Sequence, residues 1–288
     1  MKHYAQTLIS ITLFAATSLP SFAIVLRHDV TPENYLATVK DFPPLAQFYV
    51  DGAHGTLIAP TWVVTAAHTT FCTDPGVTIL VGGKHVKVKR RFVHRNYTPG
   101  VSHDFALLEL EHPITHIQPA EIYKASDELG QVITFIGIGG TGNGIDGQTI
   151  DNAKNKGVLR KANNTVAKAE GPLLQFIFNQ GNEALPLEGI SGGGDSGGPA
   201  FLKKDERYYV LGISSRGDID SMLGKYGNRE YYSRISYFKD WIHNVMYGSE
   251  QLRDAITLPK LKHLLPGLTA KNLPQVCAEI RIEPEQPN

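Results

Sequence analysis

The sequence contains little cysteine, no net charge and no long apolar stretch beyond its first 23 residues. Its two cysteines, Cys72 and Cys277, allow one internal pairing in an oxidising compartment, and two free thiols are the alternative. Lysine plus arginine and aspartate plus glutamate both number 28, so the composition gives no indication of a nucleic-acid or an acidic partner. The 288 residues, 42% hydrophobic and 19% charged, suit a globular protein of about two domains.

Residues 1–23 have the features of a signal peptide. A short basic start precedes a mostly apolar stretch from Leu8 to Leu19, Pro20 breaks that stretch, and Ser21-Phe22-Ala23 places small residues before a cleavage point. The apolar stretch is too short to span a bilayer, although a retained anchor is the alternative interpretation. No later segment approaches 18 apolar residues. We therefore expect an exported protein, secreted or periplasmic, with no membrane span.

One glycine-rich stretch, Ser-Gly-Gly-Gly-Asp-Ser-Gly-Gly-Pro at 191–199, has the composition needed for acyl transfer. Ser196 stands among small residues, so its hydroxyl is accessible. The backbone N–H groups of Gly194 and Ser196 can converge on one point and stabilise a developing negative charge. Taken alone, such a stretch is more typical of an ordinary loop, so other parts of the chain must decide.

Two further segments supply candidate partners for Ser196. The run 61–67, Thr-Trp-Val-Val-Thr-Ala-Ala, predicts a strand followed by a turn that presents His68. Asp104 directly precedes the apolar run 105–108, and a carboxylate entering a buried strand must be hydrogen-bonded or paired. A histidine is a natural partner for such a carboxylate, although a lone histidine is more often structural.

Two other patterns are less informative. Residues 137–142 match Gly-x-Gly-x-x-Gly, but the following 143–157 do not predict the helix that a dinucleotide site requires, so we expect no cofactor. The basic run from Lys84 to Arg95 alternates with valines, which predicts the solvent face of an edge strand or, alternatively, an exosite for anionic partners. Apolar residues at helical spacing predict a helix over 237–247.

Together these stretches resemble the trypsin/chymotrypsin-like serine protease family. His68 lies in Thr-Ala-Ala-His, Asp104 in Asp-Phe-Ala-Leu-Leu and Ser196 in Gly-Asp-Ser-Gly-Gly-Pro, in the family's order, whereas an α/β-hydrolase would place the serine first. The resemblance implies an all-β fold of two packed six-stranded antiparallel β-barrels, with a C-terminal helix and a short C-terminal extension. The expected division is a signal peptide 1–23, a protease domain 24–248 and an extension 249–288. Within the protease domain we expect barrels at about 24–115 and 130–236 and a helix at 237–247.

The resemblance also implies roles for these residues. His68 would take the proton of Ser196 and return it to the leaving amine, Asp104 would hold the imidazole, and the Gly194 and Ser196 amides would bind the oxyanion. In the family a freed N-terminal Ile-Val inserts, and its ammonium pairs with the aspartate beside the nucleophile. Ile24 and Asp195 match these positions. We therefore expect that removal of the signal peptide alone frees this end, without a propeptide.

The sequence departs from the family at several positions. Thr69 and His54 stand where the family usually has one disulfide, and Gly192 stands at a cysteine position of another. This pattern resembles bacterial members of the family. Stability must therefore come from packing or from a Cys72–Cys277 link. An acidic calcium loop is absent after Leu80, and we expect no metal.

The resemblance also indicates the walls of the substrate pocket. Ile190 stands where an acid would select basic side chains, and Ser215 and Gly217 should form a substrate-binding wall. Glu230 stands where a glycine usually opens the pocket. It could select basic side chains from a different wall; alternatively it faces solvent or plugs the pocket.

The expected activity is that of a secreted serine endopeptidase acting through an acyl-enzyme. A catalytically silent homologue that binds partners, and an esterase on the same fold, are the alternatives. The expected partners are a protein or peptide substrate and, as a further candidate, a protein inhibitor. We expect a monomer that binds no nucleic acid.

Overall fold

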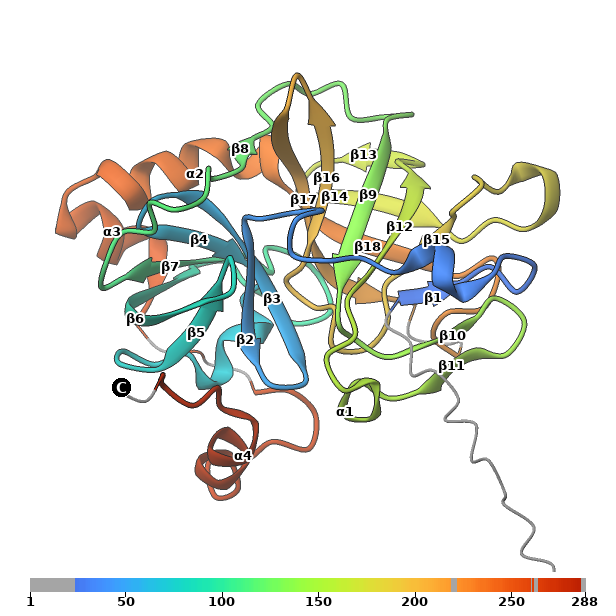
Figure 1. The fold of residues 1–288 in the computed structure, drawn as a ribbon. Helices are drawn as coiled ribbons and strands as arrows, with labels where there is room; N and C mark the ends of the chain where they lie inside the picture. Colours follow the sequence, from blue (N-terminus) through green and yellow to red (C-terminus); the bar gives the residue numbers. More distant parts are fainter. Residues whose placement is uncertain (1–23, 219–221, 260, 262–263, 286–288) are drawn as a thin grey trace, which may run out of the picture.

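The computed structural model describes residues 24–218, 222–259, 261 and 264–285, and the predicted signal peptide lies outside them. The chain forms two β units side by side, with helices at one flank of the first unit and beneath it (Figure 1). The predicted fold class is confirmed: an all-β protein of two packed six-stranded units with a C-terminal helix and an extension.

The first unit is a closed six-stranded antiparallel barrel in the order β5-β2-β3-β4-β7-β6, in which β6 also pairs with β5. Its strands are β2 (Leu45–Tyr49), β3 (Gly52–Ala59), β4 (Trp62–Thr65), β5 (Thr78–Val81), β6 (Lys84–His94) and β7 (Ala106–Leu110). The basic run is therefore not on an edge strand, and that prediction is wrong. Its alternation is correct, because Val86 and Val88 are buried while Lys87 and Lys89 face solvent.

The second unit is a half-barrel in the order β12-β9-β16-β17-β18-β14. Its strands are β9 (Val132–Gly137), β12 (Arg160–Thr165), β14 (Leu173–Ile177), β16 (Pro199–Lys204), β17 (Arg207–Gly217) and β18 (Arg229–Arg234); β13 (Lys168–Glu170) extends β14, and β8 (Glu121–Ile122) pairs with β17. Within the described residues no backbone ladder joins β12 to β14. The side chain of Asn164 on β12 spans this opening and donates to the carbonyl of Ile177 at 3.1 Å.

A small third sheet, in the order β11-β10-β1-β15, places the start of the described chain inside the second unit. Its strands are β1 (Ile24–Leu26), β10 (Thr141–Asn143), β11 (Gly147–Ile150) and β15 (Gly189–Ile190). β1 pairs in parallel with β10 and antiparallel with β15. Ile24 and Val25 are fully buried, so this apolar pair anchors the first strand.

Helix α2 (Ile235–Tyr247) covers the junction of the two units and begins two residues before the predicted helix. Its buried face includes Phe238, whose ring stacks on Phe105 with centroids 4.3 Å apart. One apolar cluster joins this face to Val64 of β4 and Ile213 of β17. Each large apolar side chain buried there contributes about 1.5–3 kcal/mol to the free energy of folding.

Among the described residues, four further short helices lie between the strands: η1 (Pro32–Tyr35), η2 (His68–Cys72), α1 (Asn152–Asn155) and η3 (Gly181–Glu183).

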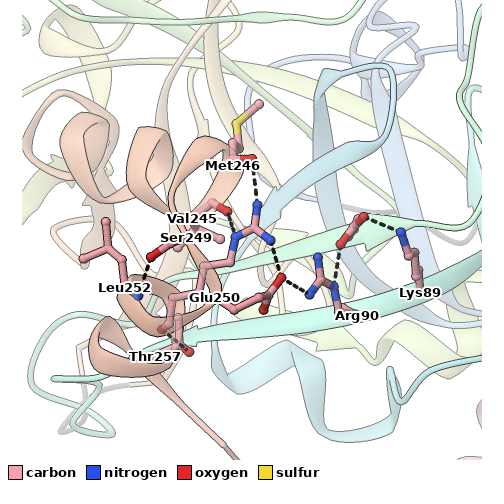
Figure 2. A network of polar contacts seen from close by, with 10 residues as sticks. Lys89, Arg90, Val245, Met246, Ser249, Glu250, Leu252 and Thr257 are labelled. Carbon is pink, nitrogen blue, oxygen red and sulfur yellow. Dashed lines mark hydrogen bonds and ion pairs between the residues drawn. The ribbon is translucent and has the colours of Figure 1, made fainter.

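The extension after residue 248 lies against the first barrel through α3 (Glu250–Ile256), β19 (Thr257–Leu258) and α4 (Leu273–Ile280). Figure 2 shows the network that fastens α3 to β6. Glu250 accepts from Arg90 at 2.9 Å and from Arg253 at 2.8 Å, and Arg90 also donates to Glu109 at 2.7 Å. Arg253 in turn donates to the carbonyls that end α2, at Val245 (2.7 Å) and Met246 (3.0 Å).

The later part of the extension is covalently tied to the barrel. Cys72, the last residue of η2, forms a disulfide with Cys277 of α4. At the end of α4, the N–H of Val50 donates to the carbonyl of Ile280 at 2.9 Å. The extension is thus docked on the barrel that carries His68.

Candidate active site

His68 and Asp104 lie side by side because β4 and β7 are paired. Thr65 on β4 stands opposite Ala106 on β7, His68 follows the first strand and Asp104 precedes the second. His68 Nδ1 is 2.6 Å from one carboxylate oxygen of Asp104, and the backbone N–H of His68 donates to the other at 2.9 Å. These two contacts fix both the position and the orientation of the imidazole.

The Asp104 carboxylate is buried, with 6% of the residue exposed, and it has further partners. Ser215 Oγ donates to the same oxygen that meets His68 Nδ1, at 2.8 Å, and Ser233 Oγ donates to the Asp104 carbonyl at 2.8 Å. Burial alone would raise the pKa of Asp104, but the charge and hydrogen bonds of His68 and the Ser215 hydroxyl outweigh it and lower that pKa. Burial would lower the pKa of His68, and the Asp104 charge and hydrogen bond reverse this and raise it.

Ser196 lies in the loop between β15 and β16, and its backbone is held against the first barrel. The N–H of His54 donates to the Ser196 carbonyl at 2.8 Å, and the N–H of Ala53 donates to the Gly194 carbonyl at 2.8 Å. The hydrogen bonds of the described residues do not include one between Ser196 Oγ and His68. Such bonds are often long before a substrate is bound.

Two positions of this loop require glycine. Gly194 has φ +97° and Gly197 has φ +75°, a region that other residues rarely adopt. A Cβ at Gly197 would lie 2.3 Å from the His54 carbonyl oxygen, and one at Gly194 would lie 2.8 Å from Asn152 Cβ. The loop therefore packs closely enough on both units that a larger residue would displace it.

Asp195 points away from Ser196 into the second unit and is buried. It accepts from the N–H of Gly139 at 2.7 Å and of Gly192 at 2.8 Å, and the backbone N–H of Ile24 also hydrogen-bonds to it. Burial raises the pKa of Asp195 to about 7, although these hydrogen bonds and the charge of the buried Arg160 oppose the shift. The structure thus brings the two residues predicted to pair, Ile24 and Asp195, into contact.

A family model for trypsin matches residues 33–242, well over half of the chain. The chain belongs to the trypsin family of serine proteases. The chain is also 28% identical to coagulation factor IX of Cavia porcellus over an alignment of 210 residues, which covers 65% of this chain and 70% of that protein.

This trypsin-family chain replaces one usual disulfide by hydrogen bonds. Where the resemblance places a cysteine pair, Thr65 Oγ1 donates to the His54 carbonyl at 2.6 Å and lies 2.9 Å from Thr69 Oγ1. His54 is fully buried, and burial lowers its pKa to about 4, so the ring is neutral and its Nε2 accepts the N–H of Ile138. Thr65 thus connects β3 to the turn that carries His68.

The predicted pocket residues of this trypsin-family member have different surroundings. Ile190 is fully buried and pairs with Val25, and Gly217 stands opposite Glu230 in the β17–β18 ladder. The Ser215 hydroxyl, predicted to lie in a substrate-binding wall, is directed to Asp104. Sequence reasoning missed this contact because it depends on where β17 crosses the first barrel.

Glu230 does not face solvent: only 3% of the residue is exposed. The backbone N–H and the hydroxyl of Ser191 hydrogen-bond to its carboxylate, while Glu230 Oε2 has no hydrogen-bond partner. Burial and the neighbouring Asp195 charge raise the pKa of Glu230 to about 8, against the hydrogen bonds from Ser191. The Ser191 hydroxyl also hydrogen-bonds with the Tyr232 hydroxyl. No sequence pattern indicated that Ser191, Glu230 and Tyr232 form a buried polar cluster.

The described part of the chain contains no cluster of three or more residues suited to bind a metal. Across the same residues, every helix is too short or too polar to cross a bilayer.

Proposed function

We propose that this trypsin-family protein is a serine endopeptidase with Ser196 as nucleophile, His68 as general base and Asp104 as the group that orients His68. The observation that carries this proposal is the double contact of Asp104 with His68, through the ring at 2.6 Å and the backbone at 2.9 Å. This contact fixes the tautomer in which Nε2 can accept a proton.

The proposed reaction has two halves. His68 Nε2 takes the proton of Ser196 Oγ while Oγ bonds to the substrate carbonyl carbon, and the N–H groups of Gly194 and Ser196 bind the oxyanion. The C–N bond then breaks as His68 gives its proton to the leaving amine. Water, activated by the same histidine, hydrolyses the acyl-enzyme and restores the serine. The raised pKa of His68 and the charge of Asp104 favour the transient imidazolium.

A fluorophosphonate probe tests this proposal. The probe loses fluoride and bonds to an activated serine, so we expect one label on Ser196 and none in the Ser196→Ala variant. A folded protein without label would favour the silent homologue as the function instead. Comparison of matched amide and ester substrates then separates a peptidase from an esterase, since an esterase would leave the amide intact.

We further propose that export activates the enzyme. Cleavage after Ala23 would convert the Ile24 backbone nitrogen into an ammonium, and that nitrogen already lies against Asp195. An ammonium in this buried place would form a charge-assisted pair with the carboxylate and hold the oxyanion loop. N-terminal sequencing of the exported protein tests the idea, and a start other than Ile24 would remove this mechanism.

Glu230 is the proposed selector of substrate side chain. Its Oε2 is buried and lacks a hydrogen-bond partner, so a cationic lysine or arginine side chain reaching it would supply the missing donor. Ile190, Ser215 and Gly217 would form the neighbouring walls. Cleavage of a peptide library by the wild type and Glu230→Gly decides between this role and a plug: an unchanged cleavage profile would rule out selection by Glu230.

We propose that the enzyme acts as an exported monomer on a protein or peptide.

A further inference from the structure

The oxyanion loop contains three successive glycines, 192–194, and its central peptide units are held by contacts from neighbouring segments. The N–H of Gly194 belongs to the same planar unit as the Gly193 carbonyl, which accepts from the N–H of Gly140 at 2.7 Å. On the other side, the Gly194 carbonyl accepts from Ala53 at 2.8 Å. Both of these contacts come from backbone groups.

The preceding peptide unit depends on a side chain. The N–H of Gly193 donates to Gln148 Oε1 at 2.7 Å. Gln148 lies on β11, opposite Gly142 of β10, and its own N–H donates to the Leu223 carbonyl at 2.7 Å. The half-buried side chain thus reaches from an anchored strand to the loop.

We infer that Gln148 is a positioning residue for the oxyanion hole, an inference that rests on the proposed function. The two peptide units on either side of Gly193 share only its Cα, and a glycine there offers little resistance to rotation. Gln148 fixes the first unit, and Gly140 fixes the second, so that the Gly194 N–H keeps its direction toward the site of the oxyanion. Without an acceptor at position 148, the peptide unit that carries the Gly193 N–H loses this restraint, and the preorganised donor becomes less well aligned.

The test compares Gln148→Met, which keeps the side-chain length but removes the acceptor, with the control Gln131→Met. Gln131 is half-buried, and among the described residues its side chain donates one long hydrogen bond, to the Asp127 carbonyl at 3.4 Å. We expect the second-order rate of fluorophosphonate labelling to fall about tenfold in Gln148→Met, less than the 10²–10³ typical for loss of an oxyanion donor itself. The control should label at the wild-type rate.

The pH profile of labelling supplies the second measurement. The apparent pKa of the rate reports His68, so it should be the same in Gln148→Met as in the wild type while the limiting rate falls. Labelling of Gln148→Met at the wild-type rate would overturn the inference, as would a shifted pKa, which would show that the triad had moved. Failure of the wild type to label would instead refute the proposed function.

Discussion

Asp104 contacts His68 through both of its carboxylate oxygens, one at the ring Nδ1 (2.6 Å) and one at the backbone N–H (2.9 Å). The ring contact fixes the tautomer of His68. The backbone contact restrains the carboxylate relative to the segment that carries the ring. A third donor, Ser215 Oγ, arrives from the second unit. Asp104, which orients His68, is thus held by residues of both β units.

Replacement of this carboxylate tests its role. Asp104→Asn keeps the shape but removes the charge and favours the wrong tautomer, so we expect kcat to fall about 10⁴-fold. Steady-state hydrolysis of a peptide amide measures the effect. Asp240→Asn, on the exposed side of α2, is the matched control and should retain full activity. A fall of less than tenfold in Asp104→Asn would contradict the role assigned to Asp104.

Ile24, which lies next to Asp195, provides a second prediction. A protein prepared to begin at Ile24 should be about 10–100-fold more active than one that begins with an additional alanine, because only the first places an ammonium against the carboxylate. Deprotonation of that ammonium would remove the charged pair with Asp195, and activity should therefore fall at high pH. Equal activity of the two preparations would contradict activation by export.

Glu230 should make the free energy of unfolding depend on pH. Its native pKa is raised from 4.5 to about 8, so between these values the native state binds more protons than the unfolded state. Stability should therefore fall as the pH rises from about 4.5 to about 8. Urea unfolding measured at pH 5 and pH 8 should show a smaller fall in Glu230→Gln than in the wild type.

The control for this prediction is Glu206→Gln, since Glu206 is exposed on the turn between β16 and β17. It should follow the wild-type pH dependence. If Glu230→Gln also follows the wild-type curve, the carboxyl is not held protonated in the native state.

The Cys72–Cys277 disulfide joins residues 205 positions apart and should stabilise the fold by about 2–4 kcal/mol. Reductant should lower the urea midpoint of the wild type, and the double variant Cys72→Ser/Cys277→Ser should unfold at that lowered midpoint with or without reductant. A wild-type midpoint unaffected by complete reduction would show that the docked extension needs no covalent tie.

The resemblance to the trypsin/chymotrypsin-like family, carried by three short motifs, was sufficient for the fold class and named the candidate site residues. The apolar run after Asp104 and the run before His68 each predicted a strand, and the glycines around Ser196 predicted a tight turn. The alternation of Lys87 and Lys89 was equally visible, but the pairing of β6 on both sides was not, because an inner strand with one solvent face has the same alternation as an edge strand. Gln148 was missed because its contact with Gly193 requires a hairpin to fold back onto a loop that is distant in the sequence.

The most direct test of the proposed catalytic role of Ser196 is mass spectrometry of the exported protein after fluorophosphonate labelling. We expect one phosphonyl adduct, on Ser196, and a much slower reaction in His68→Ala, which retains the serine but lacks the base. An adduct on another residue, or a His68→Ala protein that labels as fast as the wild type, would contradict the proposed activation of Ser196 by His68.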